Sequence, residues 1–428
     1  MQVLVIGGGG REHTLVWKLA QSPKVEKIYA VPGNPGMKNL AECVQLDVND
    51  REGLAAWAQN HHIDLTVVGP EAPLVDGLVD VFQQHGLTVF GPTARAAAIE
   101  GSKIFSKELM QKYGVPTAFF KVCDTLQEAK AFVEEKGAPI VIKADGLAAG
   151  KGVVVAMTKA EAMEALEEMM AGHKFGAAGN KVVIEEFMEG EEASLFAFTD
   201  GKTIVPMLAA QDHKRVNDGD EGPNTGGMGA YCPAPVMTPE LKQKTMDTIL
   251  RPVVDAMAKE GRPYAGCLYA GLMIKGDSVK VVEFNARFGD PETQAVLPLL
   301  KSDLPTIMVA CAKGTLRPDM VEWETDKAAV CVVMASSGYP ASYPKGLPIT
   351  GLEEAGAMQD VVVFHAGTRE ENGQILTNGG RVLGVTAVAE DILAAQRKAY
   401  AAVEKIHFDG AHYRKDIAWR ALRRINNK

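Results

Sequence analysis

The 428-residue sequence predicts a multidomain fold that mixes α/β and α+β architecture. Short apolar strands alternate with helices over the first hundred residues, which indicates a parallel, doubly wound sheet. After residue 102 the strands lengthen and follow one another as hairpins, and after residue 327 strands again predominate. We therefore predict an N-terminal domain at 1–101, a central domain at 102–326 and a small β-rich domain at 327–428.

Each of the four strands expected in the N-terminal domain ends at a loop rich in glycine or proline. The expected strands are Val3–Ile6, Lys27–Val31, Asp64–Val68 and Leu87–Phe90. The expected helices run from about Arg11 to Gln21, from the Gly69–Pro73 loop to about Gln84, and onward from Thr93. Since ligands of parallel sheets bind at the carboxyl ends of the strands, these loops are expected to face a substrate.

The central and C-terminal domains contain longer strands. The expected central hairpins pair Pro139–Lys143 with Val153–Ala156 and Val182–Glu185 with Ala193–Phe198, and a helix is expected over Lys159–Met170. The segment Asp212–Gly229 is too polar and too rich in glycine to predict regular structure. The expected C-terminal elements are the strands Ala328–Ala335, Val361–Ala366 and Arg381–Ala387 and a helix of about Ile392–Ile406.

The composition is ordinary for a soluble globular protein and argues against a nucleic-acid binder. Hydrophobic residues make up 46% of the chain and charged residues 23%, and the net charge is −9. An acidic chain is an unusual nucleic-acid binder, so no nucleic-acid partner is expected. The six cysteines form no C-x-x-C pair, which favours a reducing, cytoplasmic location. No apolar run approaches the roughly 20 residues of a membrane span, and no membrane partner is expected.

The segment Val281–Glu292 contains the most informative polar face. If it is a strand, its side chains alternate between two faces. The face expected in a core consists of Val282, Phe284 and Ala286, and the polar face consists of Glu283, Asn285 and Arg287. Carboxylate and amide oxygens suit Mg²⁺, and a guanidinium suits the charge of a phosphoryl group in transfer. The alternative is a solvated strand face, but the abrupt Gly289-Asp-Pro turn favours a metal–phosphate site.

The Gly7–Gly10 loop does not complete a dinucleotide-binding motif. The position of a third glycine holds Glu12 or His13, depending on the register, and no acid follows the second strand. Backbone N–H groups at the start of a helix still suit an anion. The loop therefore predicts a phosphate site, and a tight structural turn is an equally open alternative.

Two further segments suit a nucleotide. Lys143–Gly152 joins two strands through glycines and two lysines, so its N–H groups and cations are able to meet phosphates. In Val183–Ser194, the apolar pair Phe187-Met188 lies among five acids, which suits either a cleft for a flat base or a solvated edge.

The polar Asp212–Gly229 segment has the composition of loops that close over substrates, with a disordered loop as the alternative.

Together these motifs resemble the ATP-grasp superfamily, and within it the glycinamide ribonucleotide synthetases (phosphoribosylamine–glycine ligases). The resemblance runs essentially end to end and is most specific in Asp212-His-Lys-Arg and Asn224-Thr-Gly-Gly-Met-Gly-Ala-Tyr231. It implies a pre-ATP-grasp domain at the N-terminus and an ATP-grasp domain in the centre, with a mobile ATP lid at about 120–195. We expect a monomer or a weak homodimer.

The resemblance implies a ligase that uses ATP to join glycine to phosphoribosylamine through glycyl phosphate. The implied catalytic residues are Arg287, Asp212 and Lys214, and the implied metal ligands are Glu283 and Asn285, for Mg²⁺ or Mn²⁺. The implied ATP-binding residues are Lys103, Lys143, Gly150, Lys151, Gly152, Glu185, Glu186, Phe187, Met188 and Glu192. The implied substrate-binding residues are Gly8, Gly9, Gly10, Asn34, Glu71, Asn224, Thr225 and Gly226.

One departure and several rival functions accompany this resemblance. Many ATP-grasp enzymes carry a further acid on the preceding strand, but Cys267–Ile274 has none, so the ligands of a second metal ion stay open. A biotin-dependent carboxylase component or another carboxylate–amine ligase of purine metabolism would share the same ATP residues. A non-catalytic nucleotide-binding regulator and a nicotinamide oxidoreductase are further alternatives. The 212–231 segment distinguishes the ligase that uses glycine from the carboxylase component and from the other carboxylate–amine ligases.

Overall fold

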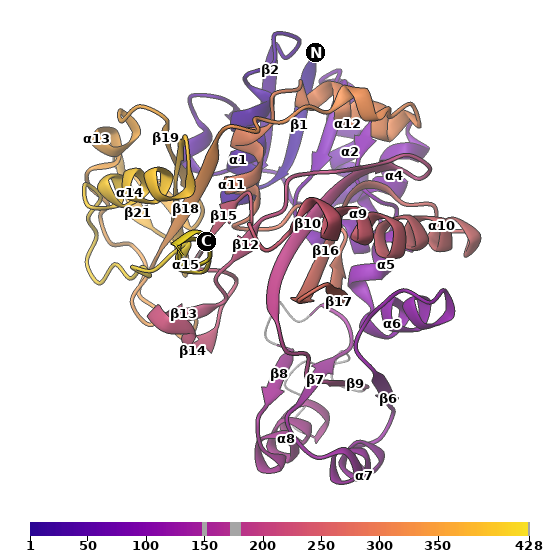
Figure 1. Ribbon diagram of the computed structural model, residues 1–428. Helices are drawn as coiled ribbons and strands as arrows, with labels where there is room; N and C mark the ends of the chain where they lie inside the picture. Colours follow the sequence, from indigo (N-terminus) through magenta and orange to yellow (C-terminus); the bar gives the residue numbers. More distant parts are fainter. Residues whose placement is uncertain (148–151, 172–180, 427–428) are drawn as a thin grey trace.

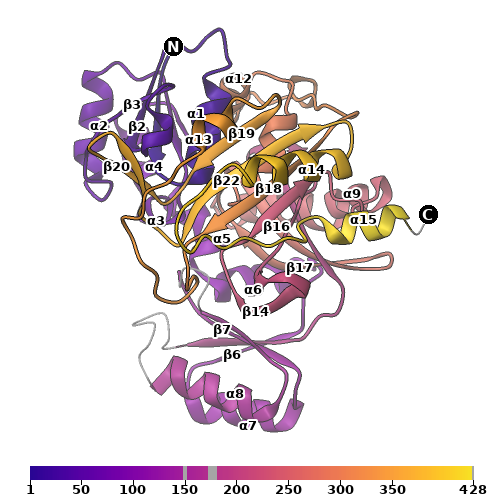
Figure 2. The same cartoon turned by 90° about the vertical axis from the view of Figure 1, so that its left-hand side faces the viewer.

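A computed structural model describes residues 1–147, 152–171 and 181–426 of the chain (Figure 1). A large body contains the N-terminal sheet, a central antiparallel sheet and a C-terminal sheet. A small lobe with helices α7 (Leu126–Lys136) and α8 (Lys159–Leu166) projects from one end of this body (Figures 1 and 2). The described helices include none that is long and apolar enough to cross a membrane.

The N-terminal sheet is parallel, as predicted, and has the order β3-β2-β1-β4-β5. Its strands are β1 (Gln2–Gly7), β2 (Lys27–Pro32), β3 (Glu42–Cys43), β4 (Leu65–Val68) and β5 (Val89–Phe90). On β1, Val3 and Val5 pack with α1 (Gly10–Leu19) and α12 (Leu304–Lys313). The alternate residues Leu4 and Ile6 pack on the other face with α2 (Arg51–Asn60) and α4 (Leu78–Gln84). Helices on both faces confirm the doubly wound arrangement.

The helices around this sheet differ from expectation at one point. The helix expected from the Gly69–Pro73 loop to about Gln84 is divided into α3 (Glu71–Val75) and α4. Gly77 separates them with a φ of +88°, a left-handed conformation that favours glycine. The chain then forms α5 (Ala94–Gly101) and α6 (Lys103–Lys112), which meet at Ser102. The side chain of Ser102 caps α6 by accepting from the N–H of Phe105.

The central sheet is antiparallel in the order β11-β10-β16-β17. It consists of β10 (Glu191–Asp200), β11 (Ile204–Pro206), β16 (Ala265–Lys275) and β17 (Ser278–Asn285), and its associated helices are α9 (Pro239–Thr245), α10 (Arg251–Lys259) and α11 (Thr293–Val296). The pairing of β16 with β17 shifts where Gly271 opposes Glu283 and Leu272 opposes Val281. The shift leaves Val282 as the extra residue of a β-bulge.

The small lobe has its own sheet and core. Its sheet has the order β6-β9-β7-β8, and its elements are β6 (Phe120–Cys123), α7 (Leu126–Lys136), β7 (Ile140–Ala144), β8 (Val153–Ala156), α8 (Lys159–Leu166) and β9 (Val182–Glu186). The predicted β7–β8 hairpin is confirmed. The predicted hairpin of Val182–Glu185 with Ala193–Phe198 is wrong, because β9 pairs with β6 and β7 whereas β10 pairs with β11 and β16.

The segment that connects the sheet of the small lobe with the central sheet explains this error. The chain turns from β9 into β10 through Phe187–Gly190, where Gly190 has a φ of +147°. A Cβ atom at Gly190 would lie 2.4 Å from the carbonyl oxygen of Ile274 on β16. The turn therefore requires glycine, and it transfers the chain to a second sheet instead of folding it back on the first.

The C-terminal sheet confirms the three predicted strands and adds two from the central segment. Its order is β12-β15-β18-β22-β19, with β12 (Gln211–Asp212), β15 (Gly229–Cys232), β18 (Ala328–Ala335), β22 (Arg381–Ala389) and β19 (Val361–His365). The remaining elements are α13 (Leu352–Gly356), the hairpin of β20 (Thr368–Glu371) with β21 (Gln374–Thr377), α14 (Ile392–Val403) and α15 (Trp419–Asn426). The two ends of the 211–232 segment are thus built into the C-terminal sheet.

The prediction that Asp212–Gly229 lacks regular structure is wrong. Between β12 and β15 it forms a hairpin of β13 (Arg215–Asn217) and β14 (Glu221–Asn224). The guanidinium of Arg414, which is fully buried, lies 2.9 Å from the carboxylate of Asp220 and 2.7 Å from that of Asp416. These contacts from the C-terminal end of the chain hold the polar segment in place, and local sequence does not reveal them.

Candidate active site

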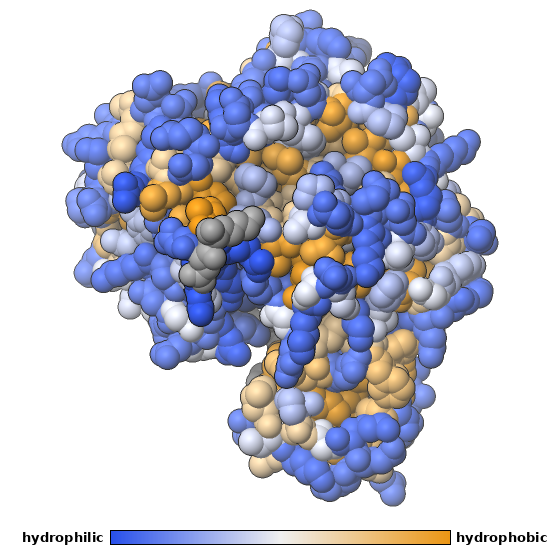
Figure 3. Space-filling view, viewed as in Figure 1, coloured by the Kyte–Doolittle hydropathy of each residue, from blue (hydrophilic) through white to orange (hydrophobic). Residues whose placement is uncertain are grey.

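The end of β17 presents the predicted polar face. Phe284 and Ala286 are buried, and Glu283, Asn285 and Arg287 lie on the opposite side and are partly exposed. The expectation that Val282 enters the core is wrong, because the bulge leaves it half-buried and Val281 takes the core position. Figure 3 shows apolar side chains gathered between the small lobe and the large body, on the side from which Figure 1 is viewed.

Glu283 and Asn285 have oxygen atoms available to a ligand. Within the described part of the chain, neither side chain makes a hydrogen bond or an ion pair. Burial acts to raise the pKa of Glu283, but the charges of Lys143, Lys214 and Lys103 outweigh burial and lower it. A charged carboxylate and a free amide oxygen form a donor pair suited to a hard divalent cation that keeps some phosphate or water ligands. No group of three or more His, Cys, Asp and Glu side chains among the described residues has metal-binding geometry.

Arg287 is held by two carboxylates of the N-terminal domain. Its Nη2 lies 2.9 Å from Glu100 Oε1, and its Nε lies 3.2 Å from Glu71 Oε2. Glu100 Oε2 also accepts a 2.7 Å hydrogen bond from the backbone N–H of Ala286. Burial alone would lower the pKa of Arg287, but the two carboxylates raise it, so the guanidinium stays charged. Sequence reasoning missed Glu100 and assigned Glu71 to substrate, without its link to Arg287.

Two of the predicted lysines approach this face from the opposite side. Lys143 Nζ lies 3.0 Å from Glu185 Oε1 and donates to the carbonyl oxygen of Val282 at 3.3 Å. Lys103 Nζ donates to the carbonyl oxygen of Gly146 at 2.8 Å. The side chain of Glu185 also lies 3.0 Å from Lys107, a lysine that sequence reasoning missed.

The predicted loop over the phosphates is described only in part. Gly152 lies at the base of the β7–β8 hairpin, where its carbonyl oxygen accepts from the N–H of Ala144 at 2.8 Å. The predicted residues Gly150 and Lys151 lie outside the described residues.

The hinge is the segment around Phe187-Met188, which is predicted to offer a cleft for a flat base, and it connects the sheet of the small lobe with the central sheet. Glu186 ends β9, and its Oε1 accepts from the N–H of Phe119 at 3.0 Å and from Lys280 at 3.3 Å. The half-buried Phe187 and Met188 follow in the crossing segment. Glu192, at the start of β10, forms an ion pair with Lys214. The structure thus brings Glu192 together with the loop that contains Lys214.

The partly exposed Asp212 lies beside the buried acid Glu292. Burial and the charge of Glu292 raise the pKa of Asp212 to about 7, although Lys214 acts against this increase. Glu292 Oε1 accepts hydrogen bonds from Ser194 at 3.1 Å and from Tyr269 at 2.5 Å. Burial also acts on the ammonium of Lys214, but Glu192 and Asp212 raise its pKa, so Lys214 is charged. The two acids of the site therefore have different neighbours: Asp212 lies near Lys214, whereas Glu292 accepts hydrogen bonds from two hydroxyl groups.

The N-terminal loops are engaged by neighbouring side chains. The N–H of Gly9 donates to Glu12 Oε2 at 2.8 Å, and the N–H of Arg11 donates to Asp290 Oδ2 at 3.3 Å. Asn34 Nδ2 donates to the carbonyl oxygens of Gly8 at 3.0 Å and of His365 at 2.8 Å. Two N–H groups around the predicted phosphate loop are therefore bound to carboxylates. Gly10 opens α1 next to them.

The predicted Asn224–Gly226 segment lies against the C-terminal domain. Asn224 ends β14, and Thr225 Oγ1 donates to the carbonyl oxygen of Lys214 at 2.8 Å. Arg381 Nη1 donates to the carbonyl oxygens of Gly226 at 2.7 Å and of Asp290 at 2.9 Å. Arg381 thus connects this segment with the turn that follows Arg287.

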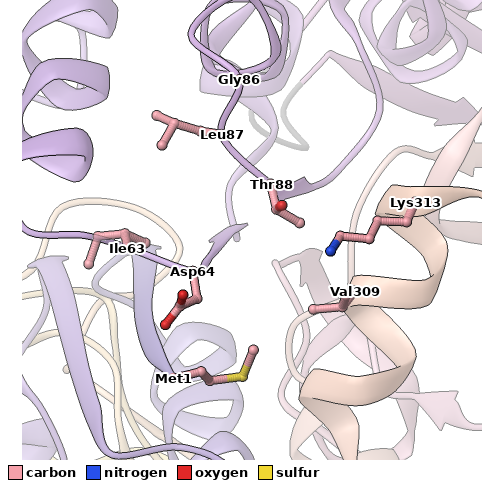
Figure 4. A pocket seen from close by; sticks show the side chains of 8 residues that line it. All are labelled: Met1, Ile63, Asp64, Gly86, Leu87, Thr88, Val309 and Lys313. Atoms are coloured by element: carbon pink, nitrogen blue, oxygen red, sulfur yellow. The ribbon is translucent and has the colours of Figure 1, made fainter.

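One hollow in the described structure lies away from these groups. It is lined by Met1, Ile63, Asp64, Gly86, Leu87, Thr88, Val309 and Lys313 (Figure 4). These residues lie at the amino ends of β1, β4 and β5 and on α12. Ligands of parallel sheets bind at the carboxyl ends, so this hollow is not the candidate active site.

Comparison with known proteins covers nearly the whole chain. Residues 1–100, 101–293 and 329–420 match the N, ATP-grasp (A) and C domains of the phosphoribosylglycinamide synthetase family. The chain is 53% identical over 422 residues to the phosphoribosylamine–glycine ligase of Halalkalibacterium halodurans, covering 99% of this chain and 97% of that protein. It is 52% identical over 434 residues to that of Escherichia coli, covering 100% of both chains.

Solved structures agree with this result. The phosphoribosylamine–glycine ligase of Thermotoga maritima superposes with a TM-score of 0.84 at 34% identity, covering 98% of this chain and 100% of that chain. The biotin carboxylase domain of Hydrogenobacter thermophilus 2-oxoglutarate carboxylase has a TM-score of 0.73 at 16% identity, covering 96% and 91%. The second likeness concerns the fold alone.

Proposed function

The chain belongs to the phosphoribosylglycinamide synthetase family, and from this premise we propose that it is an ATP-dependent ligase that joins glycine to 5-phosphoribosylamine. The products are glycinamide ribonucleotide, ADP and phosphate, in de novo purine biosynthesis. The observation that carries the proposal is the face of Glu283, Asn285 and Arg287 opposite Lys143, in a chain that matches the family from end to end.

ATP is proposed to bind between the small lobe and the central sheet. Lys103, Lys143 and the Gly150–Gly152 loop would hold its phosphates, the Glu185–Met188 segment its adenine, and Glu192 its ribose. The two buried or partly buried lysines and the half-buried Phe187-Met188 pair support this arrangement. The ion pair of Glu192 with Lys214 would give way to the ribose hydroxyls. The small lobe would act as the lid.

Glu283 and Asn285 are the proposed ligands of Mg²⁺, or of Mn²⁺ in its place. Their oxygens have no hydrogen-bond or ion-pair partner among the described residues, and the charge of Glu283 is favoured by the surrounding lysines. The bound ion would neutralise the phosphate charge that develops during transfer.

The proposed chemistry has two steps and no protein nucleophile. A carboxylate oxygen of glycine attacks the γ-phosphorus, the bond to the bridging oxygen of ADP breaks, and glycyl phosphate forms. The amine nitrogen of phosphoribosylamine then attacks the acyl carbon, the bond to the phosphate oxygen breaks, and the amine loses a proton. Arg287 and Lys214 would stabilise the charge on the transferred phosphoryl group, and Asp212 would orient glycine.

The remaining substrate is proposed to meet the N-terminal and C-terminal domains. Gly8, Gly9, Gly10, Asn34 and Glu71 would hold phosphoribosylamine, and Asn224, Thr225 and Gly226 would close beside it. The contacts of Asn34 with Gly8 and of Arg381 with Gly226 support a shared cleft. We further propose that the protein works in the cytoplasm as a monomer or a weak homodimer.

An isotope-transfer experiment tests the mechanism. Glycine labelled with ¹⁸O in its carboxylate is supplied with ATP and phosphoribosylamine, and the phosphate produced is analysed by mass spectrometry. A glycyl phosphate intermediate transfers one labelled oxygen to each phosphate. Unlabelled phosphate, with labelled glycine consumed, would exclude that intermediate.

A further inference from the structure

One buried carboxylate lies between two buried ammonium groups at the junction of the small lobe with the large body. Glu185 Oε2 lies 3.0 Å from Lys107 Nζ, and Glu185 Oε1 lies 3.0 Å from Lys143 Nζ. The exposed fractions are 3% for Lys107, 4% for Lys143 and 2% for Glu185. Burying three ions is costly unless each is paired, so the arrangement is expected to have a specific use.

Both lysines are also fixed to the bulge that precedes Glu283. Lys107 Nζ donates to Thr117 Oγ1 at 2.7 Å, and the Thr117 hydroxyl donates to the carbonyl oxygen of Val281 at 2.8 Å. Lys143 Nζ donates to the next carbonyl oxygen, that of Val282, at 3.3 Å. The cluster therefore joins α6, β7, β9 and β17, and it sets the distance between Lys143 and the proposed metal ligand.

The cluster carries more positive than negative charge. Lys103 and Lys107 are four residues apart on α6, so both project from one side of the helix. Lys107 and Lys143 share the single carboxylate of Glu185. Lys103 lies near other carboxylates, those of Glu283, Asp145 and Glu100. An uncompensated positive charge in a buried place favours an anion beside it. Lys103 and Lys143 lie next to the proposed phosphates, whereas Lys107 is occupied by Glu185 and Thr117.

We propose that Lys107 is a positioning residue for the ATP phosphates, which acts on Lys143 by sharing the carboxylate of Glu185. With Lys107 present, the carboxylate of Glu185 interacts with two ammonium groups. Because Lys143 is then only partly neutralised, it still attracts a phosphate. Without Lys107, Glu185 has Lys143 as its one close cation and draws it away from the nucleotide. This inference rests on the proposed function, because it concerns the same ATP site.

The test compares ATP with adenosine as ligands of the full chain by calorimetry in Mg²⁺. We expect Lys107→Met to weaken ATP binding by about tenfold or more, because Lys143 contributes less to the phosphates, and to change adenosine binding by less than about twofold. The matched control is Lys112→Met, which removes an exposed lysine of the same helix and is expected to leave both affinities unchanged. Equal weakening of ATP and adenosine would mean that the hinge is distorted, and unchanged ATP binding would remove the role; either result overturns the proposal.

A second comparison isolates the action through Glu185 and serves if Lys107→Met alone does not fold. The Lys107→Met, Glu185→Gln double variant has no unpaired buried carboxylate, so it is expected to fold. Relative to Glu185→Gln alone, its ATP affinity should change by less than about twofold. A tenfold loss in that background would show that Lys107 acts on ATP without Glu185 and would overturn the positioning role. If the unaltered protein binds no ATP, the proposed function itself fails, and this outcome differs from both of the others.

Discussion

The guanidinium of Arg287 lies 2.9 Å from the carboxylate of Glu100, across the boundary between the central sheet and the N-terminal domain. The other oxygen of Glu100 accepts from the N–H of Ala286, the residue before Arg287. One carboxylate thus fixes both the backbone and the side chain at this point. Since phosphoryl transfer depends on placement, Glu100 is expected to determine how well Arg287 works.

Glu100→Gln should lower kcat by roughly 10- to 100-fold, because the amide cannot form the ion pair and Arg287 is then held by Glu71 alone. The measurement is steady-state kcat at saturating substrates. Glu108→Gln, which removes an exposed carboxylate of α6, is the matched control and should retain the unaltered rate. A Glu100→Gln enzyme with normal kcat would show that Arg287 needs no support from Glu100.

Arg287→Ala should lower kcat by about 10²- to 10³-fold, because it removes a positive charge from the position of the transferred phosphoryl group. The Kd of ATP should change far less, by about fivefold or less, since the main effect is on the transition state. Kinetics and equilibrium binding on the same preparation separate the two. An unchanged kcat would remove the proposed role of Arg287.

Glu283→Gln should leave the enzyme close to inactive and should raise the Mg²⁺ concentration needed for half-maximal ADP binding by about tenfold or more, because it removes the one charged protein ligand proposed for the metal. The binding titration does not depend on turnover. Asp277→Asn, in the exposed turn between β16 and β17, is the control. Near-normal Mg²⁺ dependence in Glu283→Gln would place the metal elsewhere.

Asp212→Asn should stabilise the protein more at high pH than at low pH. The pKa of Asp212 is about 7 in the folded chain against an ordinary 3.8, so between these values the folded state binds a proton that the unfolded state has released. The stability of the unaltered protein therefore falls as the pH rises from about 4 to about 7. An Asn side chain does not titrate, so it removes this pH dependence of stability. Because Asp212 is partly exposed, we expect the gain in the free energy of unfolding to be about 1–2 kcal/mol larger at pH 8 than at pH 5.

Denaturant unfolding at the two pH values measures this effect, with Asp255→Asn, an exposed acid of α10, as the control. An Asp212→Asn effect of equal size at pH 5 and pH 8 would contradict the raised pKa. The same substitution is expected to lower activity, because Asp212 is proposed to orient glycine.

Much of the site follows from local sequence. The period of a strand is sufficient to place Glu283, Asn285 and Arg287 on one face, and the strand–glycine alternation is sufficient to predict the doubly wound sheet. The exact register is not predictable, because the bulge at Val282 arises from pairing with β16. One extra residue exchanges the core position between Val281 and Val282.

The parts that sequence reasoning missed depend on contacts between distant segments. Glu100 and Arg287 are far apart in the chain, and neither residue alone suggests the other. Lys107 looks like any charged residue of an amphipathic helix, although its spacing of four from Lys103 places both on one side of α6. The strand β15 joins the C-terminal sheet by pairing with β18, and Arg414 holds the hairpin between β12 and β15 through Asp220. Such pairings are set by tertiary structure, which a single sequence does not display.

Release of ADP with each substrate omitted in turn decides whether this chain is the proposed ligase. Purified protein with ATP and Mg²⁺ receives glycine alone, phosphoribosylamine alone, or both, and ADP is measured together with glycinamide ribonucleotide. We predict sustained ADP release only with both substrates, at one glycinamide ribonucleotide per ADP. Sustained release that needs neither substrate, or that occurs with bicarbonate or another carboxylate in place of glycine, would contradict the proposed function.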